Sequence, residues 1–264
     1  MAYDDDLREL FDLARRALAC QADLGHKEII FEPRDTHPVA AAAADTSFSS
    51  GRGPSSGSAD QMSLLQEDKP GLGEAQFSSL EDHRQAICAC DKCSLGSTRT
   101  NFVYGVGNPN AKIMFVGEAP GRDEDLKGEP FVGRAGKLLD KIIEAMGFKR
   151  QDVYIGNILK CRPPENRDPQ PDEMKTCLPY LEEQIRLIKP QFLVCLGRIA
   201  AHGLLDTTTP LGKLRGQWHD FHGIPVIVTY HPAALLRFAQ YKRPTWEDMQ
   251  TLLAAYGRLN QDKG

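Results

Sequence analysis

Four cysteines of this 264-residue chain stand in two close pairs and could bind a metal. Cys90 and Cys93 form a C-x-x-C pair, and Cys161 and Cys177 lie sixteen positions apart. A C-x-x-C pair places two thiolates in one turn, and a second pair can close a loop across the same site. Four thiolates bind Zn²⁺ or an iron–sulfur cluster, and their spacing does not choose between the two. We therefore predict a metal site here.

The other three cysteines, Cys20, Cys88 and Cys195, lie outside this set. Cys195 stands in the apolar stretch QFLVCLG, so we expect it in the core as an unreactive thiol. Cys88 could compete with Cys90 as a ligand, but only Cys90 has the x-x spacing to Cys93.

Polar residues that could act on a ligand follow three apolar stretches typical of strands. Glu118 ends AKIMFVGE, Asn157 lies within DVYIGNIL, and His231 follows GIPVIVTY. An amide at such a place can read an amide-like edge, and a carboxylate can act on water. The plain structural interpretations are that Glu118 or Asn157 caps a turn and that the single histidine is structural.

Two glycine-containing segments, GEAPGRDED (117–125) and KGEPFVGRAGKLL (127–139), follow the first of these stretches. Glycine and proline in GEAPG predict a tight turn that brings the backbone close to a ligand. Phe131 precedes a glycine-rich helix start, and such a helix N-terminus suits a phosphate or another anion. By itself, Phe131 would be ordinary core.

A parallel sheet would bring these residues together. Apolar stretches alternate with helical patterns from about residue 78 onward. We expect strands at 111–118, 152–159, 191–197 and 223–230, and helices at 79–90, 135–147, 171–190, 198–205, 232–238 and 245–259. Such alternation indicates a parallel sheet covered on both faces. Ligands of these sheets bind at the carboxyl ends of the strands, where Glu118, Asn157 and His231 would meet.

The N-terminal part has a different composition. Residues 4–25 have apolar side chains at helical spacing and predict an amphipathic helix, either docked on its own domain or bound to a partner protein. Residues 33–76 are rich in Ala, Ser, Gly and Pro and predict a disordered linker. We therefore divide the chain into an extension (1–32), a linker (33–76) and a working domain (77–264).

Charge divides the chain in the same way. The net charge is −4, yet residues 1–85 have 16 acidic and 8 basic side chains, whereas residues 86–264 have 20 and 24. A mildly basic working domain is a weak indication of nucleic-acid contact. No apolar run reaches the ~18 residues of a membrane span. The N-terminus is acidic where a secretory signal is basic, so we expect a cytoplasmic protein with reduced cysteines.

At these motifs the chain resembles the family 4 (type A, iron–sulfur) uracil-DNA glycosylases of the uracil-DNA glycosylase superfamily. The resemblance covers about residues 85–260 and rests on ACDKCSL, GEAPGRDED, GEPFVGRAGKLL, VYIGNILKCRPPENRDP, the later Cys177, LGR and YHPAALLR, in the family's order. It implies a three-layer α/β/α sandwich with a central four-stranded parallel sheet. It also implies a [4Fe-4S] cluster whose ligands are Cys90, Cys93, Cys161 and Cys177.

The resemblance further implies a monofunctional glycosylase that flips uracil out of DNA and hydrolyses its N-glycosidic bond. The product is an abasic site, the first step of base excision repair of deaminated cytosine. Gly117, Glu118 and Ala119 would line the uracil pocket. Phe131 would stack on the base, Asn157 would pair with its edge, and His231 would face its O2 atom. His231 and Glu118 are the expected catalytic residues, with Glu118 as the first candidate for activating water.

We expect DNA contacts on either side of the pocket. Leu235, Leu236 and Arg237 would form a wedge or phosphate grip, and Arg162 and Arg167 would meet phosphates. A related branch traps the abasic sugar through a histidine in a Lys-Arg-Arg-Ile-His loop. The corresponding GKLRGQW (Gly212–Trp218) has no histidine, so we expect no covalent trap. The partner would be single- or double-stranded uracil-containing DNA, bound by a monomer at the bacterial nucleoid.

Three alternatives stay open at this point. The chain could be a glycosylase of the same fold that prefers hypoxanthine or xanthine. It could be a non-catalytic iron–sulfur module that only binds DNA. It could also be a zinc protein whose four cysteines form a purely structural clamp.

Overall fold

The computed structural model describes residues 72 and 74–261, and all structural statements below refer to these residues. The helix expected at 4–25 and nearly all of the linker expected at 33–76 lie outside them. Within the described range, every helix falls short of the length and apolarity that crossing a bilayer requires.

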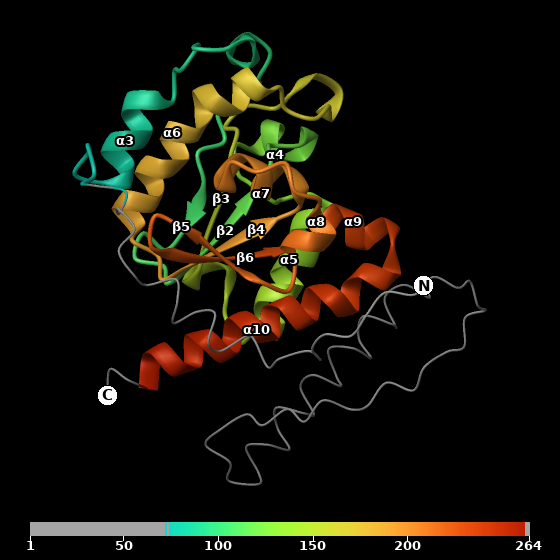
Figure 1. Ribbon diagram of the computed structural model, residues 1–264. Helices are drawn as coiled ribbons and strands as arrows, with labels where there is room; N and C mark the ends of the chain where they lie inside the picture. The colour runs from blue at the N-terminus through green and yellow to red at the C-terminus, as the bar shows by residue number, and fades with distance from the viewer. Residues whose placement is uncertain (1–71, 73, 262–264) are drawn as a thin grey trace, which may run out of the picture. The chain divides into compact units, whose positions relative to one another are not determined.

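A six-stranded sheet forms the centre of the fold (Figure 1). Its strands are β1 (Val106–Gly107), β2 (Ile113–Gly117), β3 (Tyr154–Asn157), β4 (Phe192–Leu196), β5 (Trp218–Phe221) and β6 (Ile224–Thr229). They lie in the order β1-β3-β2-β4-β6-β5. The four central strands are parallel, which confirms the predicted four-stranded parallel sheet. The sequence analysis missed β1 and β5, which pair antiparallel at the two edges.

The edge strand β5 belongs to a hairpin with β6. His222 and Gly223 form its turn, and both have positive φ angles, 52° and 84°. Two consecutive residues of this kind are what a type I′ turn between twisted strands requires. The hairpin places β6 between β4 and β5, so the strand that leads to His231 lies inside the sheet.

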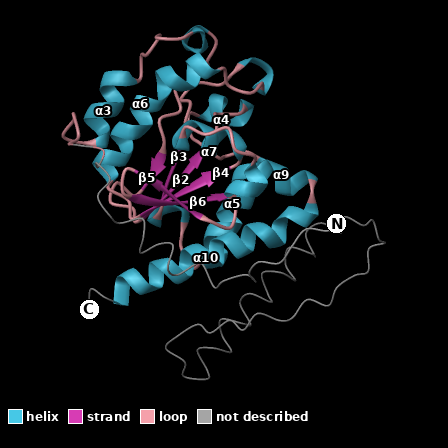
Figure 2. Ribbon diagram, in the orientation of Figure 1, coloured by secondary structure: helices cyan, strands magenta, loops and turns pink. Residues whose placement is uncertain are grey.

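Helices cover both faces of the sheet (Figures 1 and 2). The longer ones are α3 (Leu80–Ile87), α5 (Arg134–Ala145), α6 (Pro171–Ile188), α7 (Arg198–Leu205) and α10 (Lys242–Gln261). The shorter ones are α4 (Arg122–Lys127), α8 (Leu211–Leu214) and α9 (Pro232–Arg237). The six helices predicted after residue 78 are all present, and α10 begins three residues before its predicted start. Figure 1 shows α3 and α6 on one side of the sheet and α10 on the other.

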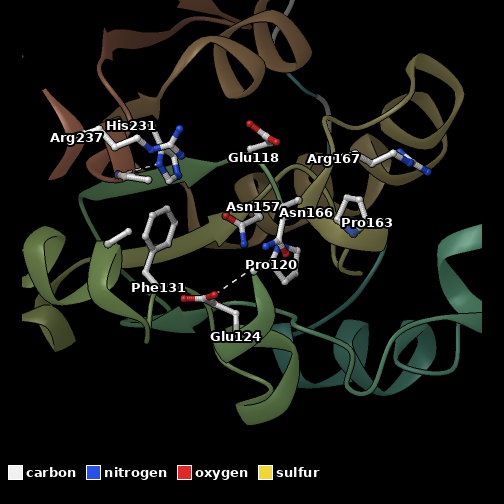
Figure 3. A pocket seen from close by; sticks show the side chains of 14 residues that line it. Glu118, Pro120, Glu124, Phe131, Asn157, Pro163, Asn166, Arg167, His231 and Arg237 are labelled. Atoms are coloured by element: carbon white, nitrogen blue, oxygen red, sulfur yellow. Dashed lines mark hydrogen bonds between the residues drawn. The ribbon is translucent and has the colours of Figure 1, made fainter. Parts of the chain in front are cut away.

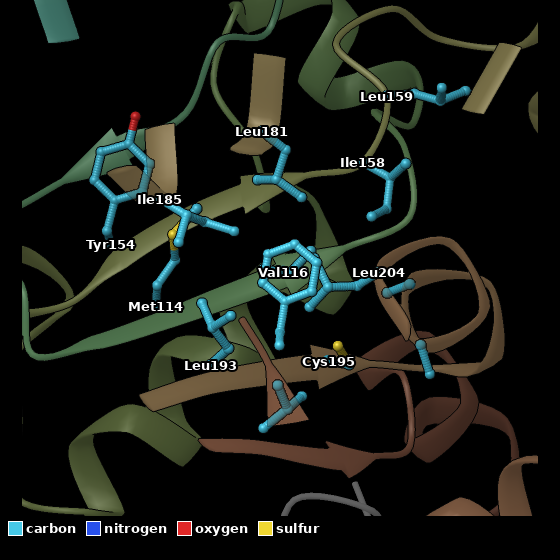
Figure 4. Close-up of a cluster of buried hydrophobic side chains, with 14 of the residues drawn as sticks. Met114, Val116, Tyr154, Ile158, Leu159, Leu181, Ile185, Leu193, Cys195 and Leu204 are labelled. Carbon is cyan, nitrogen blue, oxygen red and sulfur yellow. The ribbon is translucent and has the colours of Figure 1, made fainter. Parts of the chain in front are cut away.

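Alternate residues of β2 face opposite sides of the sheet, as the pleat dictates. Met114 and Val116 lie in one cluster with Leu181 and Ile185 of α6 and Leu204 of α7 (Figure 4). On the other face the Phe192 ring of β4 contacts the Tyr256 ring of α10 at 6.4 Å. The central strands are therefore buried on both faces, which explains their continuous apolar sequences.

Cys195 of β4 belongs to the first of these clusters and is fully buried. Burial raises the pKa of its thiol well above the ordinary value. The expectation of an unreactive core cysteine is confirmed.

The carboxyl ends of the parallel strands meet at one edge. Gly117 at the end of β2 pairs with Asn157 at the end of β3. On the other side, Leu196 of β4 pairs with Thr229 of β6, two residues before His231. Because β3 and β4 flank β2, the chain order reverses at β2, and a crevice forms outside the strand ends at such a point.

Candidate active site

A pocket of about 250 Å³ opens at this edge of the sheet (Figure 3). Of the residues predicted for a uracil site, its lining includes Glu118, Ala119, Phe131, Asn157 and His231. They lie at the carboxyl ends of three different strands and in the loop before α5, so only the folded sheet brings them together. Gly117 lies against the same group, because a Cβ atom there would meet the Asn157 amide oxygen and would come within 2.7 Å of the Phe131 ring.

Phe131 holds an unusual backbone conformation at the pocket wall. Its φ angle is 53°, a left-handed value that bulky residues rarely adopt. The following turn packs tightly on it, since a Cβ atom at Gly136 would collide with the Phe131 carbonyl group. The ring lies 5.6 Å from the His231 ring, tilted by 32°. Strain of this kind persists where surrounding contacts enforce it, often at ligand sites.

Glu124 supplies those contacts. Its carboxylate accepts hydrogen bonds from the amides of Val132 (2.9 Å) and Gly133 (3.0 Å), and from the amide of Gly121 (3.1 Å). It thus joins the GEAPG turn to the loop that carries Phe131. Sequence reasoning missed this function, although a Glu three residues after a helix start is a known capping signal.

Asn157 is the base-reading candidate, and it is 2% exposed. Among the described residues, its Oδ1 atom has no hydrogen-bond partner. A buried acceptor without a donor costs ~1–3 kcal/mol. An unpaired amide oxygen beside the pocket therefore fits a ligand that brings an N–H group.

His231 is the N-cap residue of α9, and this capping contact settles its tautomer. Its Nδ1 atom accepts a hydrogen bond from the Ala233 amide at 3.1 Å, so the proton of the neutral ring lies on Nε2. Burial lowers the pKa of His231 to about 4, against the opposing charge of Glu124 and with the help of Arg237. At neutral pH the ring is an uncharged N–H donor at the pocket.

Glu118 has the opposite perturbation. The pKa of Glu118 is raised to about 7. Burial is the main cause, the negative charge of Asp168 adds to it, and the positive charge of Arg198 opposes both. Arg198 and Asp168 form an ion pair at 2.8 Å near the pocket. Glu118 therefore titrates near neutral pH, which suits a group that accepts a proton. Arg198 had no function predicted from the sequence.

The four predicted metal ligands come close to one another on the side of α6. Cys161 and Cys177 are buried, and Cys90 and Cys93 are half-buried. The pKa of Cys161 responds to Cys90 and Cys93, and that of Cys177 responds to Cys161 and Cys93. Cys161 thus lies within electrostatic reach of each of the other three. Cys88, by contrast, is exposed, and its thiol contacts the Gln85 carbonyl.

Hydrogen-bond donors point at three of these sulfur atoms. The Tyr180 hydroxyl donates to Cys90 (3.2 Å), the Arg99 guanidinium to Cys161 (3.4 Å) and the Lys160 amide to Cys177 (3.4 Å). Donors of this kind stabilise metal-bound thiolates. Yet in the described part of the chain no three ligand-type side chains are gathered closely enough to hold a single ion.

Comparison with known proteins identifies the family. The profile of the Uracil DNA glycosylase superfamily matches residues 104–250. The chain belongs to this superfamily. The type-4 uracil-DNA glycosylase of Archaeoglobus fulgidus is 48% identical over 182 residues, which are 66% of this chain and 92% of that protein. Type-4 uracil-DNA glycosylases of Saccharolobus solfataricus (45% identical; 63% of this chain, 81% of theirs) and Thermotoga maritima (47%; 58% and 81%) are also similar.

These relatives place the chain in the type-4 group of the superfamily. The superfamily profile begins at residue 104 and leaves out Cys90 and Cys93.

The residues predicted to touch DNA are not equally available in this glycosylase. Leu235 is 2% exposed, so it cannot reach DNA while α9 is folded, and we withdraw it. Leu236 is half-buried and Arg237 is exposed at the pocket. Phe238, the next residue, is 47% exposed, and sequence reasoning missed it.

The two arginines of the proline-rich loop have partners within the protein. Arg167 lines the pocket, but its guanidinium forms two hydrogen bonds with Glu173 (2.7 and 2.9 Å). Figure 3 shows this side chain directed away from Phe131 and His231. Arg162 donates to the Asn166 side chain at 2.7 Å. Both arginines therefore order the loop, and Arg167 is the less free of the two to bind phosphate.

Proposed function

We propose that this chain is a monofunctional uracil-DNA glycosylase, which flips uracil out of DNA and hydrolyses the C1′–N1 bond. The abasic product begins base excision repair of deaminated cytosine. One observation carries the proposal: an unpaired amide oxygen (Asn157), an imidazole N–H donor (His231) and an aromatic ring (Phe131) share one small pocket. Uracil offers an N–H group, carbonyl oxygens and a flat face.

In this proposal Asn157 reads the base. Its Oδ1 atom accepts from uracil N3–H, and its amide nitrogen donates to O4. Cytosine presents an acceptor at N3 and an amino group at C4, so it would leave both amide atoms mispaired. Sites built on buried hydrogen bonds reject such analogues strongly. Stacking on Phe131 adds ~1–3 kcal/mol toward the cost of flipping.

His231 and Glu118 act on opposite sides of the breaking bond. As the C1′–N1 electron pair moves to the base, negative charge grows on uracil O2, and His231 Nε2–H stabilises it by a hydrogen bond. Glu118 takes a proton from the water whose oxygen bonds to C1′. Its pKa of about 7 supports this assignment. Uracil leaves as an anion and takes a proton from solvent.

For DNA contact we propose Phe238 together with Leu236 and Arg237. An exposed aromatic ring beside a base-binding pocket is suited to stack in the gap that the flipped base leaves. Arg237 and Arg162 are proposed to contact phosphates, and Arg167 is proposed to shape the loop.

We further propose that Cys90, Cys93, Cys161 and Cys177 hold a [4Fe-4S] cluster. When bound, the cluster would fasten the 88–99 segment to the loop after β3, and base excision requires no electron transfer from it. Support comes from four free thiols with donors on three sulfur atoms. A cluster in which each iron takes one thiolate suits this spread set better than a single zinc ion.

Three further proposals concern the location of the enzyme in the cell, its oligomeric state and its protein partner. We propose that the enzyme acts as a monomer on nucleoid DNA in the bacterial cytoplasm, where thiols stay reduced. We also propose that residues 1–32 bind a protein partner. Light scattering of the full chain and of a chain lacking residues 1–32 tests the monomer. Capture with the isolated 1–32 peptide tests the partner.

A panel of oligonucleotides tests the central proposal. The enzyme should release uracil placed opposite G, opposite A and in a single strand, and alkali should then cleave each strand at its abasic site. Strands that carry hypoxanthine, xanthine or thymine should stay intact. His231→Ala is the matched control, and it should release uracil much more slowly than wild type. Binding without release of any base would instead support a DNA-binding module. Preferential release of hypoxanthine or xanthine would overturn the base assignment.

A further inference from the structure

A buried ion pair lies behind His231, and the proposed chemistry leaves it unused. Arg215, at the end of α8, is 14% exposed, and Asp248 of α10 is 2% exposed. The Nε and Nη2 atoms of Arg215 lie 2.9 and 2.8 Å from the same carboxylate oxygen. Nη2 also donates to the Pro244 carbonyl at 2.6 Å. The guanidinium is thus fixed between α8 and the first turn of α10.

This pair holds the two residues that precede His231. The Thr229 hydroxyl, at the end of β6, donates to Asp248 Oδ2 at 2.6 Å. The Arg215 guanidinium lies over the Tyr230 ring at 4.4 Å. The other face of Tyr230 stacks on Tyr241 at 4.1 Å, with the rings only 12° from parallel. Both side chains that lead into the catalytic histidine are therefore clamped.

Stability alone does not explain such an arrangement. Apolar residues of similar volume often replace a buried ion pair without loss, so the pair is a poor device for holding the core together. The ion pair instead fixes orientation, because the planar guanidinium holds the carboxylate and the stacked ring at defined angles. The segment whose orientation is fixed in this way is the short connection between β6 and α9.

We propose that Arg215 and Asp248 are positioning residues for His231. By fixing Thr229 and Tyr230, they set the direction in which the Nε2–H bond points into the pocket. This inference rests on the proposed function of that pocket. The GKLRGQW segment, which lacks the histidine of the covalent branch, then contributes to the reaction through its arginine.

The test uses single-turnover release of uracil from double-stranded DNA by the full chain. Arg215→Met with Asp248→Asn removes the ion pair but keeps an acceptor for Thr229, and we expect the rate to fall about 10²-fold. Tyr230→Leu, which leaves the pair intact, should lower it about 10-fold. Tyr230→Phe keeps the stack and should retain the rate. KM and DNA affinity should not change, because the lost interaction forms only in the transition state.

A second comparison separates positioning from a general loss of stability. Arg186 and Glu183 form an ion pair of similar burial, 18% and 4% exposed. They belong to α6, which lies on the other side of the sheet from α10 (Figure 1). Arg186→Met with Glu183→Gln is therefore the matched control and should keep the wild-type rate. In a His231→Ala background, the Arg215 and Asp248 changes should have no further effect on the rate.

Three results would overturn the inference and leave the proposed function in place. The Arg215 and Asp248 changes could add their full effect in the His231→Ala background, or the α6 control could lower the rate equally. Tyr230→Leu could also keep the wild-type rate, a result that stands even if the paired change does not fold. A wild-type chain that is folded but releases no uracil would overturn the proposed function, and the inference with it.

Discussion

The side-chain nitrogen of Lys160 lies 2.9 Å from the carbonyl oxygen of Asn157. Lys160 is fully buried, and its Nζ atom also donates to Gln184 of α6 at 2.6 Å. Its own amide points at the Cys177 sulfur, and Cys161 is the next residue. One short segment therefore joins Asn157, the proposed base-reading residue, to the cysteine site, and Lys160 is the link between them.

Replacement of Lys160 by Met tests this link. The carbonyl of Asn157 and the side chain of Gln184 would lose a buried donor, a loss of ~1–3 kcal/mol for each group. We expect uracil release to slow about 10-fold or more and metal to leave faster under a chelator, because both sites share the segment. Lys175→Met, on the exposed face of α6, is the control. Unchanged rates of both processes would contradict the link.

The two catalytic candidates predict a specific pH profile. Glu118 must be ionised to take a proton, so the single-turnover rate should rise with pH around its pKa of about 7. His231 is already neutral, since its pKa is about 4, so its titration should not appear between pH 5 and pH 9. We expect Glu118→Gln to abolish the rise. A rise that persists in this variant would assign the titration to another group.

The losses of rate on replacing His231 and Glu118 by alanine should differ in size, and this difference distinguishes the functions of the two residues. His231→Ala removes the donor to the leaving base and should cost about 10²–10³-fold in rate, as the loss of a transition-state donor does. Glu118→Ala should cost less, because a strongly dissociative reaction depends little on its water activator. The reverse order in single-turnover assays would overturn the leaving-group assignment.

The raised pKa of Glu118 also predicts an effect on stability. The folded protein holds this proton up to about pH 7, whereas the unfolded chain releases it near the ordinary value of 4.5. Stability is therefore lost as the pH rises through this window, because the buried carboxylate must ionise. Glu118→Gln should unfold at a higher temperature than wild type at pH 8 and at the same temperature at pH 4. An equal difference at both pH values would point to another cause.

Much of this site could be predicted from sequence, for a clear reason. Buried parallel strands have continuous apolar sequences, so the strand ends at Glu118 and Asn157 were visible, and the topology of parallel sheets brought them together. Leu235 and Phe238 show the limit of this reasoning. A helix as short as α9 has too few residues for its apolar pattern to tell which side faces the core. The contact of Arg215 with Asp248 joins positions 33 residues apart that only the packing of α10 on β6 brings together.

The cysteine site provides the last prediction. Cys161 would be a cluster ligand at the root of the loop after β3, four residues from Asn157. Cys161→Ser should therefore lower both iron content and uracil release, because the loss of one ligand would loosen the segment that carries Asn157, the proposed base-reading residue. Cys88→Ser is the matched control, since this thiol is exposed and apart from the four.

Anaerobic purification supplies the measurement for both variants. We expect wild type and Cys88→Ser to contain about four iron atoms per chain and to absorb near ~400 nm, as an iron–sulfur cluster does. A colourless wild-type protein with stoichiometric zinc would replace the cluster by a zinc clamp. Full uracil release by Cys161→Ser that has lost its iron would separate the metal site from base recognition. The two sites would then share a segment of chain without depending on each other.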